Sequence, residues 1–164
     1  MRTAGNCVTV AADADGPSLT VADASGAEDS AIALSITSAL TDTDGSETLS
    51  VTIAGVPSGA SLSAGTDNGD GTWTLTPAQL AGLTITPPSD SDADFSLTVT
   101  ATSTTGTFNV TVAATSTGRI NVTVVADADA PSLTVADASG SEDTAIALSI
   151  TAALTDTDGS ETLS

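Results

Sequence analysis

The chain of 164 residues carries 21 carboxylates against two arginines, with neither lysine nor histidine, so its formal net charge is −19. This charge excludes nucleic acid as a partner, because phosphate binding needs a basic face, and it argues equally against direct contact with an anionic membrane. Only 2% of the residues are aromatic, so the sequence predicts a core built from alanine, valine, leucine and isoleucine.

Short runs of alternating apolar residues, separated by Gly, Pro and Asp, recur along the chain, and each run predicts a β-strand. Residues 77–81 predict a single helical turn that begins with a proline, whereas 23–26, 67–71 and 115–118 are predicted turns or breaks. No segment has the period of a long helix, so the sequence predicts an all-β fold, an antiparallel Ig-like or cadherin-like β-sandwich. In chain order the predicted strands cover residues 19–21, 32–36, 49–53, 60–64, 72–76, 83–85, 95–102, 107–113 and 119–125.

The role of residues 107–113 stays open at this point. As a separate strand they make the number of strands even, and the chain would then leave the unit at the end where it came in. As an extension of the preceding hairpin, or as part of a bulged last strand, they let the chain leave at the opposite end, which suits units stacked end to end.

A long internal repeat divides the chain. Residues 17–50 and 131–164 align without gaps at an offset of 114 residues, and they differ only at Ala27/Ser141, Ser30/Thr144 and Ser38/Ala152. Each copy follows a short acidic linker, Asp-Ala-Asp-Gly-Pro or Asp-Ala-Asp-Ala-Pro. Such a repeat predicts tandem units. The prediction is the C-terminal end of a preceding repeat over 1–16, a complete β-sandwich repeat over 17–130 and the truncated start of the next repeat over 131–164.

None of the predicted strands contains a carboxylate, so all 21 lie in the connectors. Carboxylates clustered on flexible loops are ligands for hard cations, and Ca²⁺ takes about six to eight oxygens at about 2.3–2.6 Å. Strand direction brings several acidic loops to the end where the chain leaves the complete unit, and a loop of the next unit faces them across the linker. Without cations these carboxylates would repel one another strongly.

We therefore predict calcium sites at the joints between units. The predicted ligands around the second linker are Glu28, Asp29, Asp90, Asp92, Asp94, Asp127, Asp129, Asp156, Asp158 and Glu161. The equivalent residues around the first linker are Asp13, Asp15, Asp42, Asp44 and Glu47.

Three stretches of the sequence carry a family resemblance: SEDTAIAL at 141–148, LTDTDGSETLS at 154–164 and GDGTWTLTPAQL at 69–80. They resemble the Ig-like/cadherin-like extender repeats of giant bacterial RTX adhesins that are exported by type I secretion. The order of acidic motifs, which ends in the Asp-x-Asp-x-Pro linker, is similar to the calcium framework of cadherin repeats. This linker is shorter than the cadherin linker, and the RTX nonapeptide Gly-Gly-x-Gly-x-Asp is absent.

The resemblance implies a calcium-dependent spacer module of a secreted, extracellular adhesin, of the kind found in biofilms. Such modules hold a distal binding region, whose ligand is unknown, away from the surface of a Gram-negative bacterium. Their direct partners are the neighbouring repeats of the same chain.

Some single motifs have a purely structural interpretation. Asp67–Gly71 is read as a plain hairpin turn, because Asx and Gly favour tight turns, and Trp73 is read as a packing residue rather than a sugar platform. Catalysis is not expected, since the chain has no His, Lys or Tyr and paired carboxylates alone would need a substrate pocket. The alternative that stays open is a ligand-binding adhesion module, for carbohydrate or protein, of the same type of surface protein.

Overall fold

The computed structural model describes residues 13–107, 110–156 and 159–164, and within these ranges the protein is all-β. The helical element there is a single 3₁₀ turn, η1 (Pro77–Leu80), as the sequence predicts. None of the described residues forms a helix with the length and apolarity needed to span a bilayer. The strands are β1 (Ser18–Ala22), β2 (Ala24–Ala27), β3 (Ile32–Ala33), β4 (Ser35–Ala39), β5 (Glu47–Ala54), β6 (Ser61–Leu62), β7 (Thr66–Asp67), β8 (Thr72–Leu75), β9 (Thr84–Thr86), β10 (Phe95–Thr107), β11 (Val110–Val125), β12 (Ser132–Ala136) and β13 (Ser149–Ala153).

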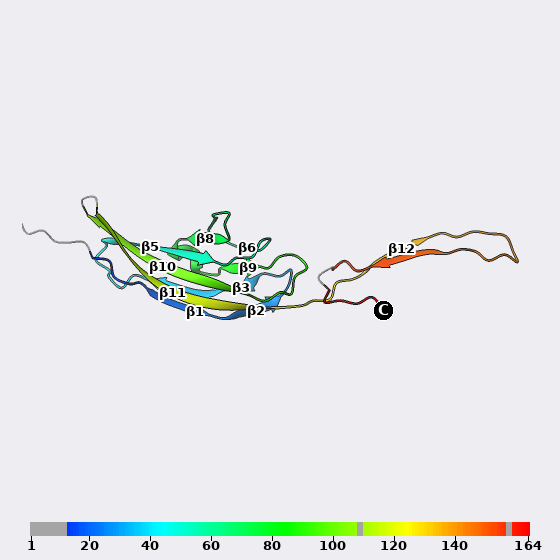
Figure 1. Ribbon diagram of the computed structural model, residues 1–164, viewed down its shortest axis with the longest axis horizontal. Coiled ribbons are helices and arrows are strands. Elements are labelled where there is room, and N and C mark those ends of the chain that lie inside the picture. Colours follow the sequence, from blue (N-terminus) through cyan, green and yellow to red (C-terminus); the bar gives the residue numbers. More distant parts are fainter. Residues whose placement is uncertain (1–12, 108–109, 157–158) are drawn as a thin grey trace, which may run out of the picture.

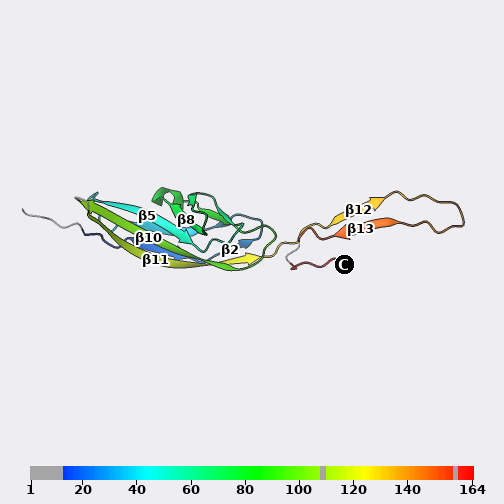
Figure 2. The same cartoon turned by 45° about the horizontal axis from the view of Figure 1, so that its top comes forward.

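Strands β1 to β11 form one elongated body, and β12 and β13 extend beyond its end (Figure 1). The largest sheet is mixed and has the order β2-β11-β10-β5-β8-β7, with its long strands curling along the body (Figure 2). A three-stranded sheet, β3-β9-β6, and the pair β1-β4 complete the body. We refer to β1–β11 as the body, and to β12, β13 and the residues between them as the outer hairpin.

An aliphatic core joins the sheets of the body, as the composition predicts. Alternate side chains of the six-stranded sheet are buried, because successive residues of a strand point to opposite faces. Trp73 and Phe95 pack against this core while partly exposed. The core residues are Ile32, Leu34, Ile36, Val51, Ile53, Val56, Leu62, Leu75, Leu80, Leu83, Ile85, Leu97, Val99, Ala101, Ile120, Val122 and Val124.

The last two strands of the body correct one predicted turn and decide between the open alternatives for residues 107–113. β10 and β11 form one long antiparallel hairpin whose pairing runs from Thr107↔Val110 to Phe95↔Val122. Thr107 and residues 110–113 therefore extend this hairpin, residues 108 and 109 lie outside the described residues, and the predicted turn at 115–118 is wrong. Gly118 instead marks a close approach of β1, since a Cβ at this position would lie 2.8 Å from Cγ2 of Val21.

The first strands of the body change partners within a few residues. Residues 23–26 were expected to break the chain, but β2 begins at Ala24 and lies parallel to β11. The prediction of purely antiparallel sheets is therefore wrong at this edge. The predicted strand 32–36 also divides, because β3 pairs with β9 whereas β4 pairs with β1. Residues 18–39 therefore contribute strands to all three sheets of the body.

Candidate metal centre

Two aspartates at the linker end of the body adopt left-handed backbone conformations. Asp29 follows β2 with φ 54°, and Asp90 lies between β9 and β10 with φ 52°. Asp tolerates this region better than most residues. Asp143, which repeats Asp29 at the offset of 114 residues, has φ 62° in the outer hairpin. Because the same turn forms at Asp143, the turn at Asp29 depends on the local sequence and not on the loop that contains Asp90.

These two aspartates meet a third that comes from the linker. The backbone N–H of Asp90 donates to Oδ1 of Asp29 over 3.2 Å, and Asp129 brings its carboxylate to the same place. One oxygen from each of the three side chains lies within 4.8 Å of the other two. Because an ion with oxygen ligands at about 2.3–2.6 Å can bridge such separations, the three aspartates form a possible metal site.

Carboxylates of the body hold the beginning of the linker through its backbone. Glu28 is only 3% exposed; its Oε1 accepts from the N–H of Asp127 over 2.7 Å, and its own N–H donates to the carbonyl of Val125 over 3.0 Å. Asp94 accepts a hydrogen bond of 2.9 Å from the N–H of Val124. These contacts fix the direction in which the chain leaves β11.

The far side of the linker is held in the same way by the following segment. The N–H of Asp129 donates to Oε1 of Glu161, and the hydroxyl of Thr155 donates to the carbonyl of Ala130 over 3.0 Å. The first linker repeats both contacts at the offset of 114 residues. There the N–H of Asp15 donates to Oε1 of Glu47 over 2.8 Å, and the hydroxyl of Thr41 donates to the carbonyl of Gly16 over 3.0 Å. The two joints therefore share one local geometry.

Each of these two glutamates also has a second oxygen that the described part of the protein leaves without a hydrogen-bond donor. Oε2 of Glu47 and Oε2 of Glu161 are both buried and make no hydrogen bond there. A buried carboxylate oxygen without a partner carries a large desolvation cost. A cation beside this oxygen would offset that cost.

The remaining predicted ligands differ in how exposed their side chains are. Asp156 is 2% exposed and accepts a 3.2 Å hydrogen bond from the Ser160 hydroxyl, whereas Asp13 and Asp92 are exposed. Asp158 lies outside the described residues. Asp42 accepts from the N–H of Asp44 over 3.0 Å, which shapes the loop before β5.

Asp44 in turn accepts from the N–H of Ser46 over 2.7 Å. Hydrogen bonds from the side chain and backbone of Ser46 hold the pKa of Asp44 below its ordinary value. This carboxylate is exposed, so it stays accessible while charged. The loop between β4 and β5 therefore presents anionic oxygens beside the first linker.

The one arginine among the described residues makes its hydrogen bond on the large sheet rather than at these sites. Of the two arginines, Arg2 lies outside the described residues, and Arg119 donates to Oγ of Ser96 over 2.7 Å on the strands of the large sheet. One further carboxylate that the sequence did not single out has a structural partner: Asp23 accepts from both the backbone N–H and the side-chain amide of Asn121, over 2.8 and 3.1 Å. An isolated Asp after a strand gave no signal for this role.

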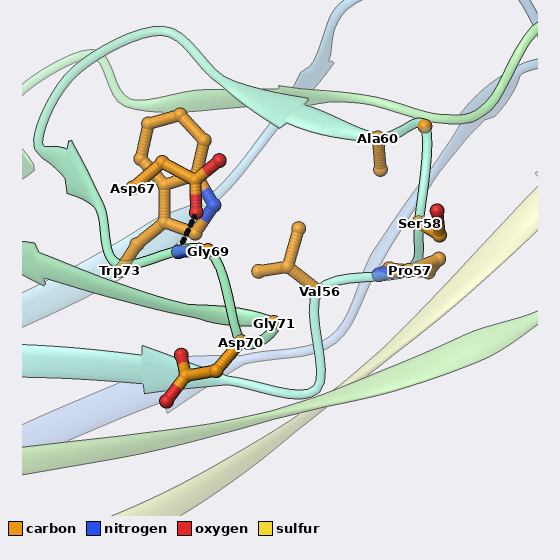
Figure 3. Close-up of a pocket in the computed structure, with 10 residues that line it drawn as sticks. Val56, Pro57, Ser58, Ala60, Asp67, Gly69, Asp70, Gly71 and Trp73 are labelled. Carbon is orange, nitrogen blue, oxygen red and sulfur yellow. Dashed lines mark hydrogen bonds between the residues drawn. The ribbon is translucent and has the colours of Figure 1, made fainter.

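A second acidic feature, the turn before β8, lines a surface pocket of about 410 Å³ (Figure 3). Both carboxylates of this turn accept hydrogen bonds from nearby residues of the same segment. Asp67 accepts from the N–H of Gly69 over 2.8 Å, and Asp70 accepts from the N–H and the hydroxyl of Thr72 over 3.0 and 2.6 Å. The Thr72 hydrogen bonds lower the pKa of Asp70. Trp73 forms part of the pocket wall (Figure 3).

No protein-family model, no curated protein sequence and no solved structure gives a significant match to this chain. The arrangement of its own residues is therefore the basis for any functional assignment.

Proposed function

We propose that the chain is a calcium-stiffened spacer module of an extracellular bacterial adhesin, built from Ig-like β-sandwich units joined end to end. The observation that carries this proposal is the repeated joint. Asp15 with Glu47, and Asp129 with Glu161, make the same backbone-to-carboxylate contact on successive linkers. A contact repeated at each joint is what an array needs if every unit is to continue in the same direction.

Calcium is the proposed ion because the donor set consists of oxygens. Asp29, Asp90 and Asp129 would supply ligands on the body side of the second joint, and the buried Oε2 of Glu161 would supply one from the following segment. Oxygen-rich, carboxylate-dominated sites suit Ca²⁺ better than the transition metals, which favour nitrogen and sulfur. The ion would offset the repulsion among these side chains and hold the linker in one direction.

The proposed role is mechanical support rather than catalysis. In this proposal the neighbouring repeats of the same chain are the partners, and the module works at the surface of a Gram-negative cell. Extracellular calcium modules typically bind with Kd of about 10⁻⁴–10⁻³ M. The joint would then stay flexible in a cytoplasm and become stiff outside the cell.

The test measures the joint directly. In a Cys7→Ser background, spin labels on Cys residues introduced at Thr74 of the body and Thr134 of the outer hairpin report the distance across the linker. Both positions are exposed. Calcium should narrow the distance distribution relative to EDTA, and calorimetry should detect calcium binding in the same range. Equal, broad distributions in both conditions would reject the stiff joint.

The pocket beside Trp73 supports a second candidate, the ligand-binding adhesion module. It combines an aromatic wall with the carboxylates of Asp67 and Asp70 (Figure 3), a combination that can hold a small polar ligand. Trp73 is the one tryptophan of the sequence, so a ligand bound in this pocket should change its fluorescence. Saturable fluorescence changes with a carbohydrate, lost in Asp70→Ala, would favour this candidate.

A further inference from the structure

The turn between β7 and β8 contains an Asn-Gly pair. Asn68 and Gly69 are both exposed, and Asn68 is the one asparagine of the sequence that a glycine follows. Gly69 has φ 79°, and a Cβ built there would meet no other atom within 4 Å. Because glycine has no side chain, nothing on Gly69 shields its backbone nitrogen from the neighbouring side-chain amide of Asn68.

Such a pair can deamidate with water as the only other reactant. The backbone nitrogen of Gly69 attacks Cγ of Asn68 and loses its proton to solvent, the bond from Cγ to Nδ2 breaks, and ammonia leaves. Water then opens the cyclic imide at either carbonyl, which gives aspartate or isoaspartate at position 68. An amide is thereby exchanged for a carboxylate, with water consumed, ammonia released and no electrons transferred.

Two threonine hydroxyls hold the amide that has to react. Nδ2 of Asn68 donates to Oγ1 of Thr72 over 2.9 Å and to Oγ1 of Thr74 over 3.1 Å, so both of its donors are used. The two threonines share one face of β8, because alternate residues of a strand point to the same side. Ring closure joins Cγ to the nitrogen of Gly69 and makes Cγ tetrahedral, so the amide has to leave these hydroxyls first.

A carboxylate holds the nitrogen that has to attack. The N–H of Gly69 donates to Oδ1 of Asp67 over 2.8 Å. Loss of the Gly69 proton would leave two anionic groups facing each other, and a neighbouring negative charge disfavours such an ionisation. The attacking nitrogen and the leaving group are therefore both held while the turn is closed.

We propose that Asn68–Gly69 is a modification site, at which the amide is converted to a carboxylate when the β7–β8 turn opens. In the closed turn Thr72, Thr74 and Asp67 hold the reaction back. The turn is suited to opening, because β7 is an edge strand of two residues and such elements open at a low free-energy cost. A carboxylate cannot donate to the two hydroxyls, so the conversion favours the open turn once it has occurred.

The modification would act on the pocket beside Trp73 rather than on the joints. Asp67, Gly69 and Asp70 belong to this turn and line the pocket (Figure 3). The converted residue adds a further negative charge between the two aspartates, and like charges at close range repel. The reaction itself requires neither calcium nor a ligand in the pocket.

The test compares the reaction in the closed and in the open turn. The chain is incubated at neutral pH in buffer and in guanidinium chloride, and peptide mass spectrometry gives the converted fraction of Asn68. A net hydrogen bond corresponds to about 2–12-fold in rate, so the three that hold the two reacting groups should make the folded chain at least about tenfold slower. Asn121, which a valine follows and whose amide donates to Asp23, should stay unconverted in the folded chain.

Thr74→Val isolates one of these hydrogen bonds. It removes an acceptor of the Asn68 amide, so conversion in the folded variant should be about 2–12-fold faster than in the wild type and unchanged in guanidinium. Thr66→Val makes the same change directly across the strand pair and should keep the wild-type rate. Equal rates for the folded and the unfolded wild type would overturn the proposal, and so would a wild-type rate in folded T74V.

A second variant tests the chemistry even if T74V fails to fold. Gly69→Ala, measured in guanidinium where the φ of the folded turn has no effect, adds a methyl group beside the attacking nitrogen. It should slow the conversion of Asn68. An unchanged rate would mean that water hydrolyses the amide directly, without ring closure, and would overturn the proposed reaction.

Discussion

The backbone N–H of Asp15 donates a 2.8 Å hydrogen bond to Oε1 of Glu47, while Oε2 of that glutamate is buried and has no hydrogen bond in the described part of the chain. The side chain thus fixes the first linker with one oxygen and keeps the other buried. Replacing Glu47 with Gln keeps an oxygen that can accept from the N–H of Asp15 and removes the charge. This substitution therefore separates the effect of the hydrogen bond from the effect of the buried charge.

Glu47→Gln is therefore expected to act in opposite directions with and without calcium. In EDTA its melting temperature should equal or exceed that of the wild type, because the buried charge is gone. In millimolar calcium the stabilisation should be smaller than in the wild type, because an ion loses an anionic ligand. Thermal melts under both conditions test this. Glu142→Gln, at an exposed position, is the control, and an equal loss for E47Q in both conditions would contradict the prediction.

The three aspartates at the second joint should couple calcium to stability. Binding to the native state alone contributes about 2.7 kcal/mol per site when calcium is at about 100 times Kd. Asp129→Asn and Asp29→Asn should each lose part of the calcium-induced rise in melting temperature. In D129N the hydrogen bond to Glu161 remains, because it uses the backbone amide. Asp67→Asn, in the turn of the pocket, should keep the full rise, and an equal loss there would point to a nonspecific charge effect.

The repeat offers a matched pair for measuring core packing. Leu34 is 6% exposed, and Leu148, the same residue in the same local sequence, is 71% exposed. Leu34→Ala should lower the free energy of unfolding by about 2–5 kcal/mol through lost burial and a cavity. Leu148→Ala should change it by less than about 0.5 kcal/mol. Urea unfolding monitored by Trp73 fluorescence gives both values, and similar losses for the two variants would mean that the outer hairpin is also packed.

Amide exchange should show the same contrast along the backbone. A two-stranded hairpin without a covering layer is marginally stable, so residues 131–164 are expected to exchange rapidly while 17–50 are protected. Peptides that contain Ala27/Ser141 or Ser38/Ala152 differ in mass between the two copies, so mass spectrometry can distinguish them. Strong protection of 131–164 in a dilute monomer would refute this expectation.

The hydroxyl of Thr72 is expected to control the titration of Asp70. Its hydrogen bond is the main cause of the lowered pKa of this carboxyl. A lowered native pKa stabilises the fold above the ordinary Asp pKa, and this contribution is lost as the pH falls through the native value. Thr72→Val should therefore raise the pKa of Asp70 toward its ordinary value, as read by side-chain ¹³C shifts. Thr74→Val, which changes a neighbouring hydroxyl that bonds Asn68 instead, should leave the Asp70 titration in place.

The apolar alternation of the sequence predicts most strands of the body: β1, β5 and β10 each contain the run that suggested them, and β8 covers most of its predicted run. Two glycines led to wrong predictions of chain breaks. Gly118 and Gly26 look like chain breaks in the sequence, yet both lie within strands where another side chain approaches closely. Sequence alone cannot separate these two uses of glycine, because the neighbour that excludes a Cβ comes from a distant or differently paired segment.

The candidate site was predictable in its composition but not in its grouping. The pattern of acidic loops predicts acidic groups around both linkers, and Asp29, Asp90 and Asp129 are among the predicted residues. That these three converge, while Asp92 is not in the group, depends on the left-handed turns at Asp29 and Asp90. Likewise Glu47 reads as a loop residue but begins β5 with its side chain buried, which is set by tertiary packing.

The parallel pairing of β2 with β11 determines how the body responds to tension along the chain. These strands run in the same direction, from Ala24↔Val122 to Ala27↔Val125; the chain reaches β2 from the first linker through β1, and it leaves β11 into the second linker. A pull on the two linkers therefore moves β2 and β11 past each other and loads their hydrogen bonds in shear, so that they must break together rather than one by one. The hydrogen bond from the N–H of Glu28 to the carbonyl of Val125 adds to this pairing, so we expect this edge of the sheet to be the part of the body that resists extension most.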